Sequence, residues 1–425
     1  MSRAPGLARE VGLIGLTAIA VNGVVGSGIF VLPATVAGLM GESSPVAYVV
    51  AGALTALVVL CFAEAGSLFE ETGGPYIYAR AAFGRFVGFE VGWMFFLSRL
   101  AAAAAIANAF TAYLATLWPG AGAGGGRLAA ITLLVGLLTA VNLVGVRYGS
   151  WTVNALTVAK LLPLFLLLAV GLPMADPERY RLLSLPDGGA LRRAALLLVF
   201  AFGGFENANV PSEEAQNPRR DLPIALVVAI ASTAVLYVLI QIVALGTVPG
   251  LAQEKAPLAA AGRAVLGPMG ALLITSCAVV STSGSLSALV LVGPRILYAF
   301  AQGGQLPAAL GRVHPTYRTP HVGVLVFALL IWVAALFGSF AQLAAISAIA
   351  RLLFSAATCL AVPVLRRKMP DAQRRLTVPG GMLVPVAASA VSLWLLSGIT
   401  PSQATAGAIA LGVGAALGLL AERRR

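Results

Sequence analysis

The stretch VNGVVGSGIFVLP, residues 21–33, lies inside the first long apolar run of the chain. It places three glycines, a serine and a proline where an unbroken helix would be expected. Each glycine in a helix interior costs about 1 kcal/mol relative to alanine, and an unpaired backbone group in hydrocarbon costs still more. We therefore expect the helix to unwind at Gly26, Ser27 and Gly28 because that break serves a function.

The composition around this stretch is that of an integral membrane protein. Of 425 residues, 59% are hydrophobic and only 10% are charged, whereas roughly a quarter are charged in a typical soluble domain. A helix needs about 20 apolar residues to cross a bilayer, and the chain has twelve such runs. They lie near 12–39, 46–69, 86–118, 128–146, 151–171, 190–211, 222–248, 264–301, 321–338, 340–365, 378–398 and 401–421.

The positions of the positive charges predict the orientation of the chain. With a cytoplasmic N-terminus, seventeen lysines and arginines fall on the cytoplasmic side and seven on the other. This bias, together with an even number of spans, predicts that both termini are cytoplasmic in a multi-pass protein of the cell membrane. The first run is too long for a signal peptide, so we expect no cleavage there. The net charge of +12 is accounted for by this topology and not by nucleic-acid binding.

A second break resembles the first. GVVGSGIF (23–30) interrupts the first run and FAFGGFENANVP (200–211) interrupts the sixth, so the second break lies five spans after the first. We expect one transmembrane domain over 1–425, with repeats of opposite orientation over 1–171 and 190–365 and two further helices over 378–421. Paired, glycine-interrupted spans are a sequence sign of a transporter binding site.

The groups freed by the breaks indicate the ligand. Amides of Gly26 to Ile29 would lie at the positive N-terminus of a half-helix, which suits a carboxylate. Carbonyls near Val24, Phe200 and Gly203 would be acceptors for an ammonium. An α-amino acid carries both groups. The alternative is that the small residues only permit close helix packing, but two matched breaks favour the functional interpretation.

Four motifs in order extend this pattern along most of the chain. They are GSGIF (26–30), FAEAGSLFEETGGPYIYARAAFG (62–84), FGGFENANVPSEEAQNPRRDLPIAL (202–226) and RILYAFAQGGQLPAALGRVHPTYRTP (295–320). Together they resemble the amino acid–polyamine–organocation family of permeases. The resemblance implies an all-α, LeuT-type fold of two inverted five-helix repeats plus two helices. Of these twelve transmembrane helices, the first and sixth would be broken. The resemblance also implies alternating access around a central site.

Carried onto this sequence, the resemblance implies a substrate site at the two breaks. The carboxylate site falls on Gly26, Ser27 and Gly28, with the Ile29 amide close by. The amine-binding carbonyls fall on Val24, Phe200 and Gly203, and the Phe200 ring would help to cover the substrate. A further pocket residue is expected at Leu289 of the eighth span.

Lys160 is the most informative charged residue within the spans. In relatives that do not use sodium, a lysine of the fifth span replaces the cation between the first break and the eighth span, and Lys160 matches that position. Its expected partners are carbonyls near Asn22 and Gly23 and the hydroxyl of Ser285, with Ser281 one turn away. Burial disfavours a charged lysine and carbonyl contacts favour it, so a proton carrier and a permanent structural cation both stay open.

Other ionisable residues in the spans are expected to be paired or functional. Glu206 occupies the position of the family's membrane glutamate, with proton transfer or gating as its role and a neutral, hydrogen-bonded acid as the alternative. Glu64 is expected to be structural. For Glu90, Arg99 and Arg351 we expect a charged pair among them, and the alternative is that Arg99 reaches the pocket and binds an acidic substrate.

The pocket walls indicate the substrate. Ala102 to Ala105, Gly203, Gly204 and Leu289 are small or apolar, which favours neutral amino acids that are small to medium or apolar. The alternatives are a cationic amino acid, a polyamine or another organocation, or a membrane sensor or channel on the same scaffold. Coupling would be to protons or by amino acid exchange. The three cysteines lack the spacing of metal ligands, and we expect no metal, no cofactor and no enzymatic activity. Whether the protein has an accessory subunit or forms an oligomer stays open at this point.

Overall fold

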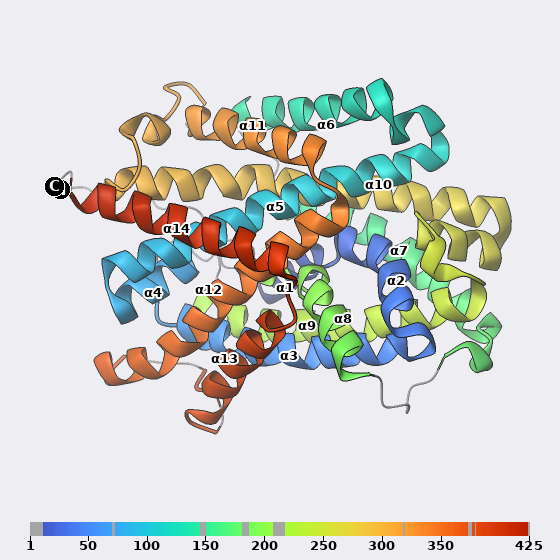
Figure 1. Ribbon diagram of the computed structural model, residues 1–425, viewed down its shortest axis with the longest axis horizontal. Helices are drawn as coiled ribbons and strands as arrows, with labels where there is room; N and C mark the ends of the chain where they lie inside the picture. The colour runs from blue at the N-terminus through green and yellow to red at the C-terminus, as the bar shows by residue number, and fades with distance from the viewer. Residues whose placement is uncertain are drawn as a thin grey trace.

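The computed structural model describes residues 12–69, 73–144, 150–180, 187–206, 217–317, 319–372, 376–378 and 380–423, and these form helices joined by turns (Figure 1). The α-helices are α1 (Leu13–Val24), α2 (Ser27–Met40), α3 (Ser44–Gly66), α4 (Pro75–Phe83), α5 (Arg85–Leu117), α6 (Gly124–Val144), α7 (Ser150–Met174), α8 (Gly188–Ala201), α9 (Pro218–Thr247), α10 (Pro257–Gln302), α11 (His321–Phe337), α12 (Phe340–Lys368), α13 (Leu383–Leu396) and α14 (Pro401–Arg423). Short 3-10 turns occur at Gly41–Ser43, Pro119–Gly122, Pro177–Arg179, Leu251–Gln253 and Ala308–Gly311.

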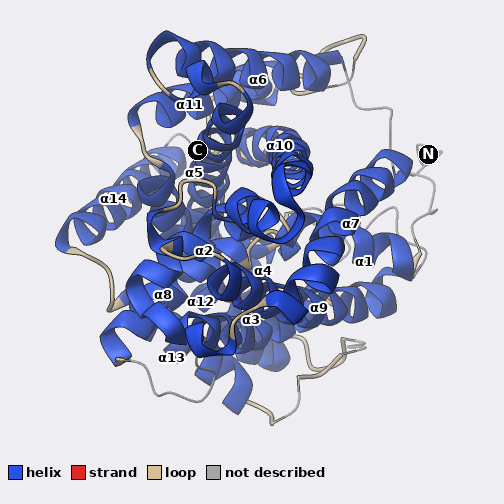
Figure 2. Cartoon of the chain, turned by 90° about the vertical axis from the view of Figure 1, so that its right-hand side faces the viewer, coloured by secondary structure: helices blue, strands red, loops and turns tan. Residues whose placement is uncertain are grey.

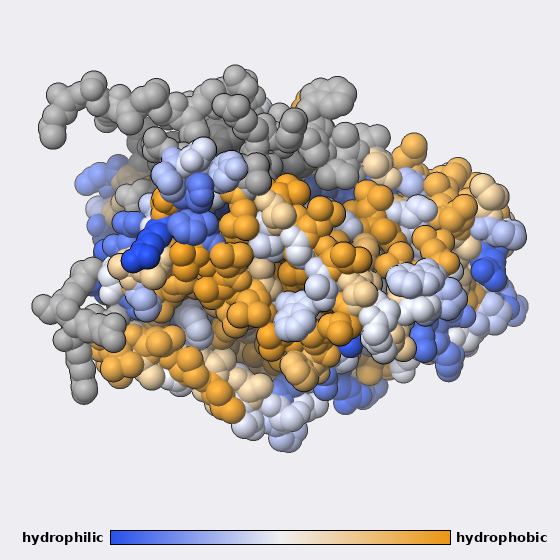
Figure 3. Space-filling model, turned by 90° about the horizontal axis from the view of Figure 1, so that it is seen from above, coloured by the Kyte–Doolittle hydropathy of each residue, from blue (hydrophilic) through white to orange (hydrophobic). Residues whose placement is uncertain are grey.

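Several of these helices are long and apolar enough to cross a membrane. Within the described residues there are seven such segments: Ser27–Gly66, Arg85–Leu117, Gly124–Leu143, Arg220–Thr247, Pro257–Gln302, Phe340–Lys368 and Pro401–Leu420. The first of these contains α2 and α3. Figure 3 shows the matching surface, with apolar side chains over much of the middle of the face and hydrophilic residues gathered toward its two ends. The fold is therefore that of an all-helical, multi-pass membrane protein.

The break predicted in the first apolar run occurs slightly earlier than expected. Helix α1 ends at Val24, Val25 has φ −72° and ψ 84°, and α2 begins at Ser27 with Gly26 as its N-cap. The unwound segment is thus Val25–Gly26, and Ser27 and Gly28 already belong to the second half-helix. The expectation of unwinding through Gly28 was wrong because two residues suffice to redirect the chain.

The second break follows α8. Helix α8 ends at Ala201, residues 202–204 form a turn, and Phe205–Glu206 form a single 3-10 step. Gly204 has φ +114°, a conformation that favours glycine. The remainder of this predicted span, with the sequence NANVP, lies outside the described residues.

Two features of the chain were not predicted from the apolar runs. Helix α4 follows the second run and packs against α5 and α12. The run 264–301 is part of a longer element, because α10 starts at Pro257 and changes direction at Gly267, where φ is +66°. Glycine at 267 permits this left-handed backbone, and Pro268 starts the longer helical part.

The helix packing brings the two breaks into the middle of the molecule. Helix α2 packs against α8, α1 against α7 and α9, and α3 against α9. Helix α5 packs against both α10 and α12, while α6 and α11 pair with each other. Figure 2 shows α6 and α11 at one side of the molecule and α3 and α13 at the other, with α2, α8 and α12 between them.

Glu64 ties α3 to the end of α12. Its carboxylate accepts hydrogen bonds from Arg366 Nε at 2.7 Å and Arg366 Nη2 at 2.6 Å, and Oε2 also accepts from the Val378 amide at 2.7 Å. Glu64 is 1% exposed. A bidentate arginine–carboxylate pair at a buried position fixes both orientation and distance, so this contact holds the segment after α12 against α3. The structural role expected for Glu64 agrees with this geometry.

We predict that Glu64→Gln destabilises the protein by about 2–4 kcal/mol, because it leaves the Arg366 guanidinium without its buried carboxylate. The measurement is the melting temperature in detergent. Glu254→Gln is the matched control, since Glu254 lies exposed between α9 and α10. Equal melting temperatures for the two variants would contradict the structural role of Glu64.

Candidate functional site

The two breaks lie directly against each other. An ideal Cβ atom on Gly28 would be 2.6 Å from Ala201 Cα, and one on Gly204 would overlap the carbonyl of Gly23. Both glycines therefore permit two main chains to approach more closely than any side chain would allow. The crossing brings the start of α2 and the end of α1 to the turn after α8.

Hydrogen-bond donors gather at the start of α2. The N-cap residue is Gly26, which has no side chain that could accept a hydrogen bond from the first amides of α2. Ser27 is 2% exposed, and its Oγ has no hydrogen-bond partner. Ser285 Oγ of α10 is also buried without a partner, and it lies 3.3 Å from the position that a Cβ on Gly26 would take. Amides and hydroxyls in this arrangement suit an anion such as a carboxylate.

The carbonyls at the end of α1 face a buried lysine. Lys160 Nζ of α7 donates to Asn22 O at 2.7 Å and to Val25 O at 2.6 Å, and Ser281 Oγ lies 3.4 Å from Val25 O. One carbonyl partner of Lys160 is therefore Val25 and not, as was expected, Gly23. Ser285, the expected hydroxyl partner of the lysine ammonium, lies beside Gly26. The lysine is 2% exposed. It supplies donors to two carbonyls that the break removed from the helix ladder.

Tyr237 is a neighbour of the break that the sequence analysis missed. Its hydroxyl lies 2.8 Å from Val24 O and 3.3 Å from Ala201 O, and its side chain is fully buried. One hydroxyl thus bridges the ends of α1 and α8. A carbonyl has two acceptor positions, so Val24 O retains one for a ligand. The sequence could not predict this role, because a single tyrosine within the apolar sequence of α9 does not alter its hydropathy pattern.

The remaining residues expected to bind substrate surround the crossing. Ile29 is fully buried at the start of α2, and Leu289 is 5% exposed on α10. Phe200 packs edge-on against Phe340 of α12, with ring centroids 5.6 Å apart. The Phe200 carbonyl accepts from the Gly203 amide at 3.2 Å within the turn.

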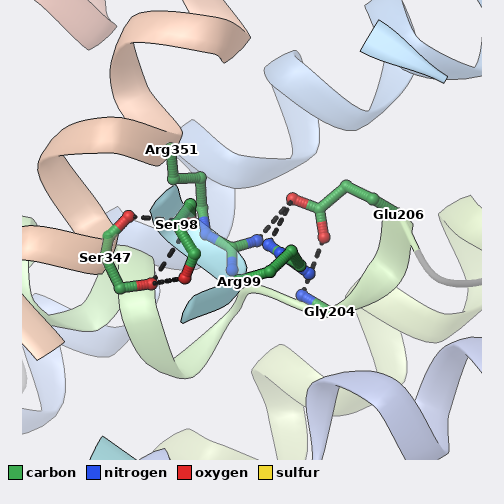
Figure 4. Close-up of polar contacts among 6 residues, drawn as sticks. All are labelled: Ser98, Arg99, Gly204, Glu206, Ser347 and Arg351. Atoms are coloured by element: carbon green, nitrogen blue, oxygen red, sulfur yellow. Dashed lines mark hydrogen bonds and ion pairs between the residues drawn. The ribbon is translucent and has the colours of Figure 1, made fainter. Parts of the chain in front are cut away.

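A charged cluster lies beside this turn (Figure 4). Arg351 Nη1 of α12 forms a hydrogen-bonded ion pair with Glu206 Oε1, and Arg99 Nη2 of α5 lies 3.6 Å from the same oxygen. Glu206 Oε2 accepts from the Gly204 amide at 2.8 Å. The carboxylate therefore orders the turn while it holds two guanidinium groups.

The helices that carry the two arginines are joined one residue away from Arg99. Ser98 Oγ lies 3.0 Å from Ser347 O, and Ser347 Oγ lies 2.9 Å from Ser98 O (Figure 4). The Arg99 guanidinium also lies over the Phe95 ring, 5.1 Å from its centroid. These contacts fix α5 against α12 and aim both arginines at Glu206.

The charged pair predicted among Glu90, Arg99 and Arg351 is therefore not what the structure shows. Both arginines pair with Glu206, whereas the buried Glu90 oxygens have no hydrogen-bond partner and lie beside Gly414 of α14. Spacing along a helix could not reveal this, because the partner lies on a third helix. Within the described residues, no group of three or more His, Cys, Asp or Glu side chains is placed to hold a metal ion.

A cavity leads from the charged cluster to one end of the molecule. It has a volume of about 540 Å³, and Phe95 and Glu206 lie at one part of its wall. The rest of its wall comes from the start of α4, the last turns of α10 and the loop that follows α10, including Tyr76, Arg295 and Val313. These segments carry the basic residues for which the charge bias predicts a cytoplasmic location.

Known proteins resemble this chain over most of its length. Residues 11–411 match the family model described as amino acid permease. The chain is 28% identical to a serine/threonine exchanger of Bacillus subtilis, covering 92% of this chain and 91% of the relative. It is 27% identical to a branched-chain amino acid permease of the same organism, covering 92% and 88%. A large neutral amino acids transporter small subunit of Mus musculus is 31% identical, covering 89% and 74%. The chain therefore belongs to the amino acid permease family, the amino acid–polyamine–organocation group that its motifs resemble.

Proposed function

We propose that this protein is a secondary active transporter that moves amino acids across the cell membrane by alternating access. The crossing of the two breaks supports the proposal, because the start of α2 lies against the end of α8 and Gly204 lies against Gly23. The carbonyls of Val24, Phe200 and Gly203 would then lie near the first amides of α2. An α-amino acid would place its carboxylate at Gly26, Ser27, Gly28 and Ile29 and its ammonium at those carbonyls. The family membership and the names of the relatives support the same conclusion.

The architecture proposed with this function is a single LeuT-type domain over 1–425. Its repeats would span 1–171 and 190–365, and 378–421 would add two helices, giving twelve membrane crossings with cytoplasmic termini. Each of the twelve apolar runs contains at least one helix, and in this architecture the two breaks would occupy corresponding positions in the two repeats. A sensor or channel on the same scaffold is the alternative, and it would bind amino acids without carrying them across.

The coupling that we propose is independent of sodium. The Lys160 ammonium lies at the carbonyls of Asn22 and Val25, with Ser281 close by, which is the place where the sequence analysis expects a cation. A charged lysine stabilises the end of α1, and loss of its proton would release these carbonyls. Transport would then be driven by a proton gradient or by exchange against internal amino acid.

The cavity beside Glu206 supports an access route from the side predicted to be cytoplasmic. Its wall includes Glu206, which is itself bonded to the turn after α8. We propose that Glu206 with its arginines closes this route when substrate is held between the breaks. Opening on one side of a fixed site while the other is closed is the geometry that alternating access requires.

Gly28→Ala tests the crossing. The added methyl group would meet Ala201 main-chain and side-chain atoms at 2.6–2.7 Å, so α2 and the turn after α8 must separate. We expect binding and uptake of amino acids in proteoliposomes to be lost. Gly38→Ala is the matched control on the same helix, because its methyl group would lie at an ordinary 3.6 Å from Ala252. Unchanged binding by Gly28→Ala would mean that the crossing is only a packing contact.

Lys160→Ala tests the coupling. In proteoliposomes we expect the wild-type protein to take up amino acid without sodium and faster with an inward proton gradient. The variant should lose the stimulation by the gradient, because the proton-binding amine is gone. Lys255→Ala, on the exposed loop between α9 and α10, should retain it. A variant at position 160 with undiminished stimulation would show that the lysine is a structural cation and not the proton carrier.

A further inference from the structure

Arg351 occupies the space beside Gly203 that a side chain at that position would fill. An ideal Cβ on Gly203 would overlap the Arg351 guanidinium, and the arginine is only 4% exposed. Gly203 precedes Gly204, which touches the carbonyl of Gly23 at the crossing of the breaks. The guanidinium of α12 therefore lies at the edge of the proposed substrate site, and the glycine gives it room.

The hydrogen bonds of Arg351 leave one edge of its guanidinium unused. Nη1 pairs with Glu206 Oε1, whereas Nε is buried and has no hydrogen-bond partner. A buried donor without an acceptor costs about 1–3 kcal/mol, and more when the group is charged. A carboxylate accepts strong hydrogen bonds from a guanidinium, so Nε is a donor for a second carboxylate in addition to Glu206.

The pocket walls expected from the sequence offer few other groups that would recognise a substrate side chain. Ala102 to Ala105 of α5 and Leu289 of α10 are apolar and buried. Glu206 is shared between Arg351 and Arg99, so its negative charge is already divided between two cations. A ligand that brings its own negative charge would improve the electrostatic balance of this buried cluster.

We propose that Arg351 binds the side-chain carboxylate of the transported substrate, and that this substrate is an acidic amino acid. The inference rests on the proposed function, because it requires the α-amino and α-carboxyl groups to occupy the two breaks. It replaces the neutral side chain predicted from the apolar walls of the pocket. That prediction treated Arg351 as part of a structural pair, whereas the fold brings its guanidinium to Gly203.

The competing explanation is a purely structural arginine. A small cavity of about 20 Å³ is lined by Arg351, Thr55, Ser355 and Ser392, among other residues. One water molecule fits such a volume and would accept a hydrogen bond from Nε without any substrate. In that case the arginine would stabilise the turn through Glu206 and would have no influence on which amino acid is carried.

The test compares acids with their isosteric amides in the wild-type protein. Proteoliposomes are loaded with an unlabelled mixture of amino acids, and entry of labelled aspartate, glutamate, asparagine and glutamine is measured. We expect at least a tenfold higher ratio of maximal rate to half-saturation concentration for one acid over its own amide. Uptake of amides or other neutral amino acids without such a preference would overturn the inference and leave the proposed transport intact. No uptake of any amino acid, either by exchange or with an inward proton gradient, would instead overturn the proposed function itself.

Variants then assign the preference to Arg351. Arg351→Gln should lower the ratio for the acid at least tenfold while that for the amide changes less than threefold, and Arg351→Lys should retain part of the preference. Arg263→Gln, at an exposed position of α10, should behave as the wild-type protein. An acid preference that persists in folded Arg351→Gln would overturn the assignment. If that variant does not fold, protection of the wild-type protein against heat by aspartate or glutamate, but not by the amides, is expected, and equal protection would overturn the inference.

Discussion

A helix that breaks inside a membrane must find new partners for the backbone groups it releases, and the central part of this structure depends on how that is done. At Val25–Gly26 the end of α1 exposes carbonyls and the start of α2 exposes amides. Lys160 and Tyr237 supply donors to the carbonyls. The amides have no side-chain cap, and the adjacent hydroxyls of Ser27 and Ser285 have no partner. The carbonyl end of the break thus receives donors from two side chains, whereas the amide end has no side-chain cap.

At the second break, a carboxylate accepts a hydrogen bond from the unwound backbone. Glu206 accepts the Gly204 amide and holds the turn that follows α8. Because a lone carboxylate in hydrocarbon would be costly, the fold brings Arg351 and Arg99 to it from two other helices. The ionisable groups around the two breaks are therefore the partners that allow the helices to unwind.

The sequence predicts those parts that depend on local chemistry. Hydropathy is sufficient for the apolar runs, and glycine clusters indicate both breaks, although not their exact limits. The importance of Lys160 follows from the family resemblance. The sequence could not predict which side chains pair between helices that are distant along the chain. Arg99, Arg351 and Glu206 meet only because α5, α12 and the turn after α8 pack together, and the packing of α10 brings Ser285 to Gly26 and not to Lys160. The bend at Gly267 was missed because a glycine between apolar residues leaves the hydropathy profile unchanged.

The most direct test of the central claim is a binding measurement on the purified protein with three matched ligands. These are the transported amino acid, the amine that lacks its α-carboxylate and the acid that lacks its α-amino group. If the start of α2 binds the carboxylate and the carbonyls at the breaks bind the ammonium, each analogue should bind at least about tenfold more weakly, since a hydrogen bond to a charged group contributes about 1.5–3 kcal/mol. Equal affinity for the amino acid and either analogue would contradict the account.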